Sequence, residues 1–195
     1  WNADAVLGVA RDDALAALEK HAPVAGWILD ATSFPKGGDP AVGGTRPYRG
    51  ILGQTDNGQV AVTRSLANAT RSVPCAARLY LPESWAEDLP RRPAADVPDD
   101  VVFLEKWRIA LPQIERPLAE GMPKAPILAD AGDGDATALR EAIPALGLSY
   151  AVGVPGQVTV WWPGEEPLPP KRRPGRGRPP TRLRRDAKHR PVSIE

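Results

Sequence analysis

An acid-rich turn marks the second half of the sequence. Residues 125–142 read APILADAGDGDATALREA, in which an apolar run ends on Asp130 and small residues follow with Asp133 and Asp135. Carboxylate oxygens are the ligands that Mg²⁺ and Mn²⁺ prefer in proteins. Asp and Gly are also common turn residues, and Asp caps helices, so a plain turn is the alternative interpretation. A metal site requires a second carboxylate on a neighbouring strand.

A candidate for that second carboxylate lies near the N-terminus. The segment GWILDATSF (26–34) predicts a short buried strand over Trp27–Leu29 that ends on Asp30. If this strand and the strand before Asp130 are parallel neighbours, both carboxylates meet at the same edge of the sheet. The sequence therefore predicts a metal site made by Asp30 and Asp130.

The elements that would position these carboxylates follow from the spacing of apolar residues. Helical spacing predicts helices over 3–21, 102–121 and 136–146, the second of them disturbed by Pro112 and Pro117. Alternation predicts strands at 46–53, 59–68, 72–82 and 149–155, with a hairpin turn at Asp56-Asn57-Gly58 and one more possible strand in 156–164. Residues 82–100 are polar and rich in proline, which indicates a surface excursion. This order predicts an α/β fold, a mixed sheet with flanking helices.

Composition limits the class of protein. The chain has 195 residues, of which 42% are hydrophobic, enough for one domain with a core. The single cysteine, Cys75, excludes an internal disulfide framework and favours a reducing compartment, so we expect a cytoplasmic protein. No apolar stretch reaches the ~18 residues of a membrane span.

Positive charge is concentrated in the C-terminal part. Residues 171–190 hold ten Lys or Arg and one Asp, a net charge of +9, so the remaining 15 basic and 23 acidic residues carry −8. The segment PGRGRPP (174–180) contains Arg-Gly-Arg-Pro, the core of an AT-hook, whose extended arginines fit a narrow minor groove. The alternative is a solvated charged linker. The predicted DNA contacts are Arg172, Arg173, Arg176, Gly177, Arg178, Arg182, Arg184 and Arg185.

Five blocks of sequence together resemble a known family. They are WILDATSFPKGG, GQTDNGQVAV, RLYLPESWAED, ILADAGDGD and GRGRPPTRLRRDAKHRPVS, and they follow one another along most of the chain. In this order they resemble the DDE-type transposases of bacterial insertion sequences, in the group of DDE superfamily endonucleases. The resemblance implies a ribonuclease H-like fold, with the first catalytic acid at Asp30 and the second at Asp130.

The resemblance also implies a reaction and its participants. Such enzymes cleave DNA and transfer strands with two Mg²⁺ or Mn²⁺ ions, so Asp30 would bridge the ions and Asp130 would hold one of them. The expected partner is double-stranded DNA at the element ends, bound by a homo-oligomer of the full-length protein. Lys36 would touch a phosphate near the metals, although an exposed lysine without such a role is the alternative. The third acid of the family, a Glu, lies downstream of the basic segment, so we expect none in this chain.

Some positions depart from the family pattern. Ala31 stands where a second acid is usual, and Pro47, Gly58 and Asp133 also replace the common residues. With both ends expected to be truncated, we predict that the chain alone does not cleave. The alternatives are an inactive remnant that only binds DNA and a ribonuclease H-like nuclease without transposition. The expected domains are a helical lead-in at 1–26, an incomplete catalytic core at 27–163 and a basic, Pro/Arg-rich arm at 164–195.

Overall fold

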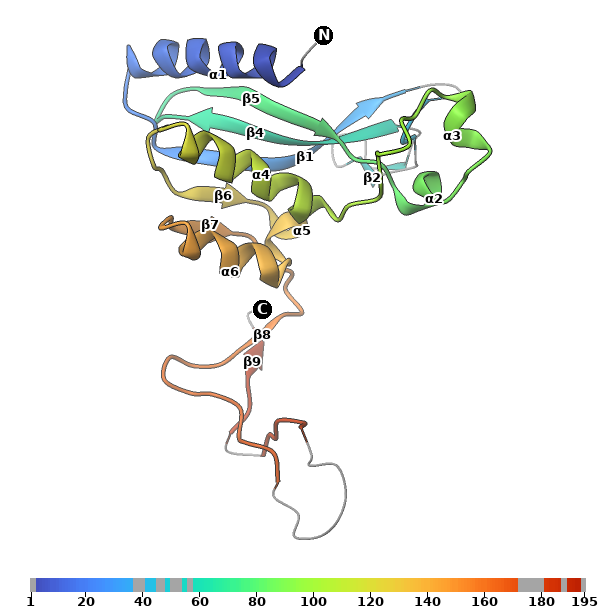
Figure 1. Cartoon of the computed structure of the whole chain (residues 1–195). Coiled ribbons are helices and arrows are strands. Elements are labelled where there is room, and N and C mark those ends of the chain that lie inside the picture. The colour runs from blue at the N-terminus through green and yellow to red at the C-terminus, as the bar shows by residue number, and fades with distance from the viewer. Residues whose placement is uncertain are drawn as a thin grey trace. The chain divides into compact units, whose positions relative to one another are not determined.

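A computed structural model describes residues 3–36, 41–44, 48–49, 54–55, 58–171, 181–186 and 189–193. The chain divides into two compact units, Trp1–Gly153 and Val154–Glu195 (Figure 1). Residues 154–163, assigned to the core from the sequence, fall in the second unit. Each unit is described by itself.

Unit 1 is built on a five-stranded mixed sheet in the order β5-β4-β1-β6-β7. Its strands are β1 (Gly26–Pro35), β4 (Gly58–Ala67), β5 (Ser72–Leu79), β6 (Ile127–Ala129) and β7 (Tyr150–Val152). Strands β1, β4 and β5 pair in antiparallel fashion, while β6 is parallel to both β1 and β7. The predicted ribonuclease H-like mixed sheet with flanking helices is confirmed.

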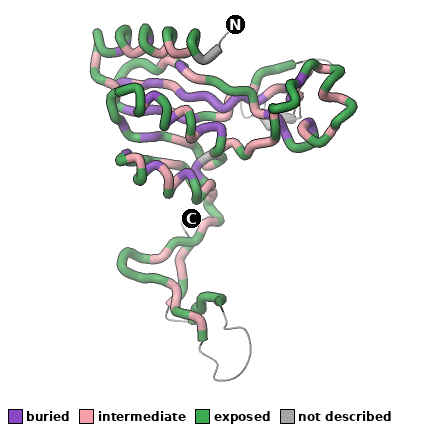
Figure 2. The backbone as a smooth tube through the Cα atoms, viewed as in Figure 1, coloured by how far each residue is buried: buried purple, intermediate pink, exposed green. Residues whose placement is uncertain are grey.

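Three helices pack with the sheet to form the core. Helix α1 (Ala3–Glu19) contacts β5 and β4, α4 (Lys106–Ala119) contacts β4, and α6 (Thr137–Ala145) contacts α4 and β7 (Figure 1). Alternate residues of a strand point to opposite faces. In β1, Trp27 and Leu29 are buried in the same apolar cluster as residues of these helices, whereas Asp30 is exposed. Figure 2 shows that buried residues gather along the strands of the sheet. The sheet therefore has a helix-covered face and a more open one.

The expected second strand does not belong to this sheet. Residues 48–49 form β2 (Tyr48–Arg49), which pairs with β3 (Gln54–Thr55) in a separate two-stranded sheet. Strand β1 pairs with β4, from Gly26↔Ala67 to Pro35↔Gly58. The ten-residue β1 uses the whole length of β4, and local alternation cannot identify that partner. Asp56 and Asn57 of the expected hairpin turn lie outside the described residues.

The prolines in α4 do not break the helix. Pro112 and Pro117 both lie inside a continuous helix that begins at Lys106. A proline removes one backbone donor and crowds the preceding turn. Helical stability in proteins comes largely from packing of an apolar face, and Ile109, Ala110 and Ile114 are almost fully buried here. We attribute the continuity of α4 to this packing.

The expected surface excursion at 82–100 has a small core of its own. It contains α2 (Glu83–Ala86) and α3 (Arg91–Ala94), and Leu81, Trp85 and Val97 form a second buried cluster. Trp85 is fully buried, and its Nε1 donates to the carbonyl oxygen of Gly44 at 3.0 Å. The buried indole of Trp85 thus provides the apolar surface against which this proline-rich segment packs.

Unit 2 contains little regular structure. Strand β8 (Thr159–Val160) pairs with β9 (Val192–Ser193), and Leu168 forms an isolated bridge with Arg184. The possible strand in 156–164 is therefore present as β8, outside the main sheet. Across the part of the chain that the structure describes, every helix is too short or too polar to cross a membrane.

Candidate metal centre and basic arm

The parallel pairing of β1 and β6 brings the two predicted acids together. The register runs Trp27↔Ile127 to Leu29↔Ala129, and the next residue on each chain is Asp30 or Asp130. Paired strands lie about 4.8 Å apart. One detail of the prediction is wrong, because β1 does not end at Asp30 but continues to Pro35 along β4. At Asp30 only the pairing of β1 with β6 ends. Asp30 and Asp130 therefore follow directly after the last paired residues of these two parallel strands.

Hydroxyl groups on the open face orient Asp30. The Oγ1 of Thr32 donates to Asp30 Oδ2 at 3.1 Å, and the Oγ1 of Thr63 donates to the Asp30 carbonyl oxygen at 3.1 Å. The two threonine hydroxyls are 3.3 Å apart. Asp30 and Thr63 are cross-strand partners. A rigid strand and a short hydroxyl network therefore fix the direction of this exposed carboxylate.

The turn after β6 is shaped around Asp130. The backbone N–H of Gly132 donates to Asp130 Oδ1 at 2.9 Å, and the N–H of Gly134 donates to the Asp130 carbonyl oxygen at 2.8 Å. These bonds start the one-turn helix α5 (Ala131–Gly134). Asp130 is exposed. The acid-rich turn is thus both a turn, as the alternative interpretation has it, and a holder of one carboxylate.

Two glycines make this turn possible. A Cβ on Gly134 would collide with the carbonyl oxygen of Gly153, and a Cβ on Gly153 would lie 2.7 Å from the backbone nitrogen of Ala131. The N–H of Gly153 also donates to the Ala129 carbonyl oxygen at 2.9 Å. Gly153, the residue after β7, therefore packs directly against the turn that carries Asp130.

Asp135 and Lys36 do not join this pair. Asp135 is exposed in the turn before α6, and the side chain of Asp133 lies outside what the structure describes. Lys36 follows the last residue of β1, six positions after Asp30, which corresponds to about 20 Å of extended strand. No three His, Cys, Asp or Glu side chains among the described residues are grouped so that they could hold a metal. The candidate centre is thus a pair of carboxylates.

Part of the basic arm is described. Arg182, Arg184 and Arg185 are exposed and line a hollow together with Lys171. The Nε of Arg184 donates to the carbonyl oxygen of Pro169 at 2.9 Å, so one donor of this side chain is already used. The Trp161 ring packs on the His189 ring with 4.9 Å between the two centroids. The predicted contacts Arg172, Arg173, Arg176, Gly177 and Arg178 lie outside the described residues.

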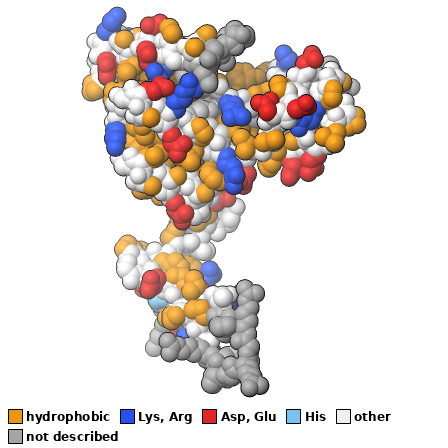
Figure 3. All heavy atoms as spheres, in the orientation of Figure 1, with side chains coloured by type: hydrophobic (Ala, Val, Ile, Leu, Met, Phe, Trp, Pro, Cys, Tyr) orange, Lys and Arg blue, Asp and Glu red, His pale blue; other side chains and the backbone are white. Residues whose placement is uncertain are grey.

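Charged side chains on unit 1 are distributed differently. On the face in view, acidic and basic groups are interspersed (Figure 3). A broad field of one sign would attract DNA over a large area, and this face does not carry one. The excess of positive charge in the sequence lies instead in residues 171–190.

Sequence reasoning missed a buried arginine. Arg64 is only 2% exposed, and it follows Val60 and Val62 and precedes Leu66 on one face of β4. In a period-two pattern these positions share a face. An arginine at a position where the pattern expects an apolar residue is the sequence signal that could have identified Arg64 as buried.

The comparison with known families gives a match over the whole chain. The family model described as DDE superfamily endonuclease matches residues 1–195. No curated protein matches the sequence.

Proposed function

The chain belongs to the DDE superfamily endonuclease family, and on that premise we propose that it acts in DNA transposition through a metal site at Asp30 and Asp130. The observation that carries the proposal is the parallel register of β1 and β6, in which these acids are the next residues after the pair Leu29↔Ala129. Resemblance of five ordered blocks favours transposition over general nuclease activity.

The donor set suits Mg²⁺ or Mn²⁺. Both residues are solvent-accessible carboxylates, and Mg²⁺ is commonly held by one or two carboxylates together with substrate phosphate oxygens. Two bound ions would activate the attacking hydroxyl group and stabilise the leaving oxygen of the cleaved phosphodiester. The residues of this chain orient the ligands: Thr32 holds the Asp30 carboxylate, and the Gly132 N–H holds that of Asp130. Such hydrogen bonds to ligands tune metal affinity.

The basic arm would bind the DNA. Arg182, Arg184 and Arg185 are exposed on unit 2, where they can contact phosphates, and the Arg176-Gly177-Arg178 sequence suits a minor groove. Binding and cutting then belong to different parts of the chain. Each can be removed without the other.

Metal binding tests the proposed centre. Asp30→Asn and Asp130→Asn each keep the size of the side chain and remove a ligand charge, while Asp135→Asn is a matched control on an exposed acid of the same turn region. We expect Mn²⁺ affinity, measured by titration calorimetry, to fall at least ~10–100-fold in the first two variants. Equal Mn²⁺ affinity in all three variants would exclude the site.

Salt dependence tests the arm. Replacing Arg182, Arg184 and Arg185 together by Gln should reduce the slope of log affinity against log salt by about 0.9 for each phosphate that the arm no longer neutralises. A control triple in unit 1 replaces the exposed residues Lys20, Arg71 and Arg108. If the control lowers the slope as much as the arm variant, DNA is not bound mainly by the arm.

A further inference from the structure

Arg64 carries a positive charge in the interior of unit 1. It lies on β4 with 2% of its surface exposed, and its guanidinium is 5.0 Å from the ring centroid of Trp27. Within the described part of the chain, its Nε and Nη1 have no hydrogen-bond partner. Burial lowers the pKa of Arg64 below its ordinary value. A buried charge with unmade hydrogen bonds is strongly unfavourable, so such groups are normally paired.

A cavity adjoins this guanidinium. It has a volume of about 340 Å³ and lies between α1, α4 and the strands β4 and β5. Its charged lining residues are Arg11, Arg64, Arg78, Arg116 and Glu120. Four cations and one anion give the lining a net charge of +3 when Cys75, whose pKa is raised by burial, is neutral.

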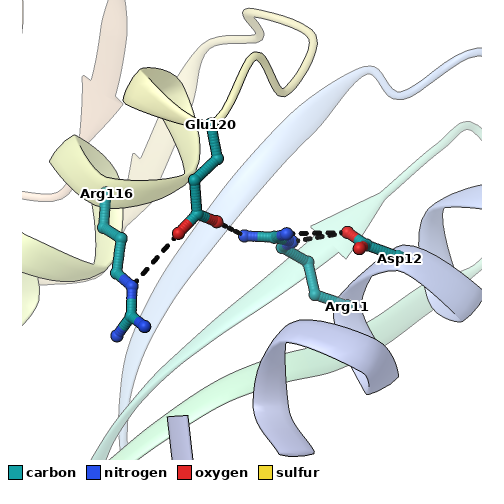
Figure 4. Close-up of polar contacts among 4 residues, drawn as sticks. All are labelled: Arg11, Asp12, Arg116 and Glu120. Carbon is teal, nitrogen blue, oxygen red and sulfur yellow. Dashed lines mark hydrogen bonds and ion pairs between the residues drawn. The ribbon is translucent and has the colours of Figure 1, made fainter. Parts of the chain in front are cut away.

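The single acid of the cavity is already used by other arginines. Glu120 binds Arg11 through Oε2, and its Oε1 accepts from Arg116 Nε at 3.2 Å (Figure 4). Arg11 is also paired with Asp12 at 2.8 Å. None of these bonds reaches Arg64, so Glu120 gives the buried guanidinium no hydrogen bond.

We propose that this cavity binds a small oxyanion, a phosphate or a carboxylate, with Arg64 as its buried anchor and Arg11 and Arg116 at its side. Guanidinium groups match such oxygens in geometry and charge. The site is separate from the proposed metal centre. Arg64 is the cross-strand partner of Leu29, whereas Asp30 pairs with Thr63, and successive residues of a strand point to opposite faces. The proposal therefore does not rest on the proposed function.

Titration with inorganic phosphate and with acetate tests the site, at constant ionic strength set by NaCl. An anion that binds only the folded protein stabilises it, so Tm should rise by about 3–6 °C at an anion concentration of ~10 Kd. Phosphate also stabilises proteins without binding. The quantity compared is therefore the rise in Tm of wild type minus the rise in Tm of Arg64→Met. We expect that variant to lose the specific rise and the calorimetric binding heat, and the exposed control Arg108→Met to keep both. Whichever of phosphate and acetate binds more tightly identifies the class of oxyanion.

A second pair of variants supplies the anion from the protein itself. Gly8 on α1 lines the cavity, and a Cβ there would meet nothing within 4 Å. Gly8→Glu would bring a carboxylate to the cavity, and Gly8→Gln has the same shape without the charge. We expect Gly8→Glu to have the higher Tm in chloride and to lose the phosphate response that Gly8→Gln keeps. Equal behaviour of these two variants, or equal responses of wild type and Arg64→Met, would overturn the proposal.

Discussion

Two adjacent cross-strand pairs of β1 and β4 carry opposite charges to opposite faces of the sheet. Asp30 lies beside Thr63 and is exposed, whereas Arg64 lies beside Leu29 and is buried. A charge in water can exchange its partners at little cost, while a charge in the interior needs one fixed partner. Neighbouring positions in one strand pair thus suit different tasks: the exposed carboxylate suits a metal that also meets substrate, and the buried arginine suits an anion in the adjoining cavity.

The largest expected difference between the faces is in stability. Trp27→Ala should lower the free energy of unfolding by about 3–5 kcal/mol, because the fully buried indole fills the core beside Arg64. Its neighbour Ile28 points to the other face and is only half-buried, so Ile28→Ala should cost about 1 kcal/mol. Urea unfolding measures both. Similar decreases would mean that both faces are equally packed.

Disturbing the close contact between Gly153 and the turn that carries Asp130 should have the next largest effect on stability. Gly153→Ala places a methyl group within 2.7 Å of the Ala131 nitrogen, so the turn must shift, at a cost of about 1–3 kcal/mol. Gly8→Ala is the matched control, since the space at Gly8 is open and alanine favours a helix. We expect urea midpoints to fall in the first variant and not in the second. If the Asp130 turn holds a metal ligand, Mn²⁺ affinity should fall with Gly153→Ala as well.

Removing the two charges should have unequal effects on stability in chloride buffer. Arg64→Met replaces a buried, incompletely hydrogen-bonded cation by an apolar side chain of similar length, which is expected to raise the free energy of unfolding by about 1–2 kcal/mol. Asp30→Asn changes an exposed group and should stay within ~0.5 kcal/mol. Destabilisation by Arg64→Met in chloride would show that interactions within the protein already compensate this charge.

The smallest expected effect is a pH dependence at the rim of the cavity. The hydrogen bond from Arg11 holds the pKa of Glu120 below its ordinary value. The stabilisation from a depressed carboxyl pKa is complete above the unfolded-state pKa of about 4.3 and is lost as pH falls through the folded-state value. Wild type should therefore exceed Glu120→Gln in urea midpoint at pH 7, and the gap should narrow as pH falls below about 4.3. A difference in urea midpoint that does not change with pH would mean that packing, and not the charge of Glu120, causes it.

The sequence predicted the α/β class, and its hypothesis of parallel neighbouring strands matches the register that precedes Asp30 and Asp130. Apolar runs before each acid carry that information. The sequence did not predict which antiparallel strand pairs with β1, because alternation describes a strand and not its partner. Nor did it predict that β1 continues to Pro35, which places Thr32 in the strand beside the Asp30 carboxylate. The pairing of Arg11 with Glu120 depends on how α1 and α4 meet, which no local pattern contains.

The parallel pairing of β1 with β6 also has a consequence for the order of folding. Residues 27 and 127 pair across 100 positions of chain, whereas β4 and β5 join across a short turn from Ala67 to Ser72. Closing a long loop costs more entropy, and distant contacts form slowly. A chain still being synthesised holds Asp30 before Asp130 exists. The proposed cutting centre would therefore assemble late, so an incompletely folded chain would have no competent site with which to damage DNA.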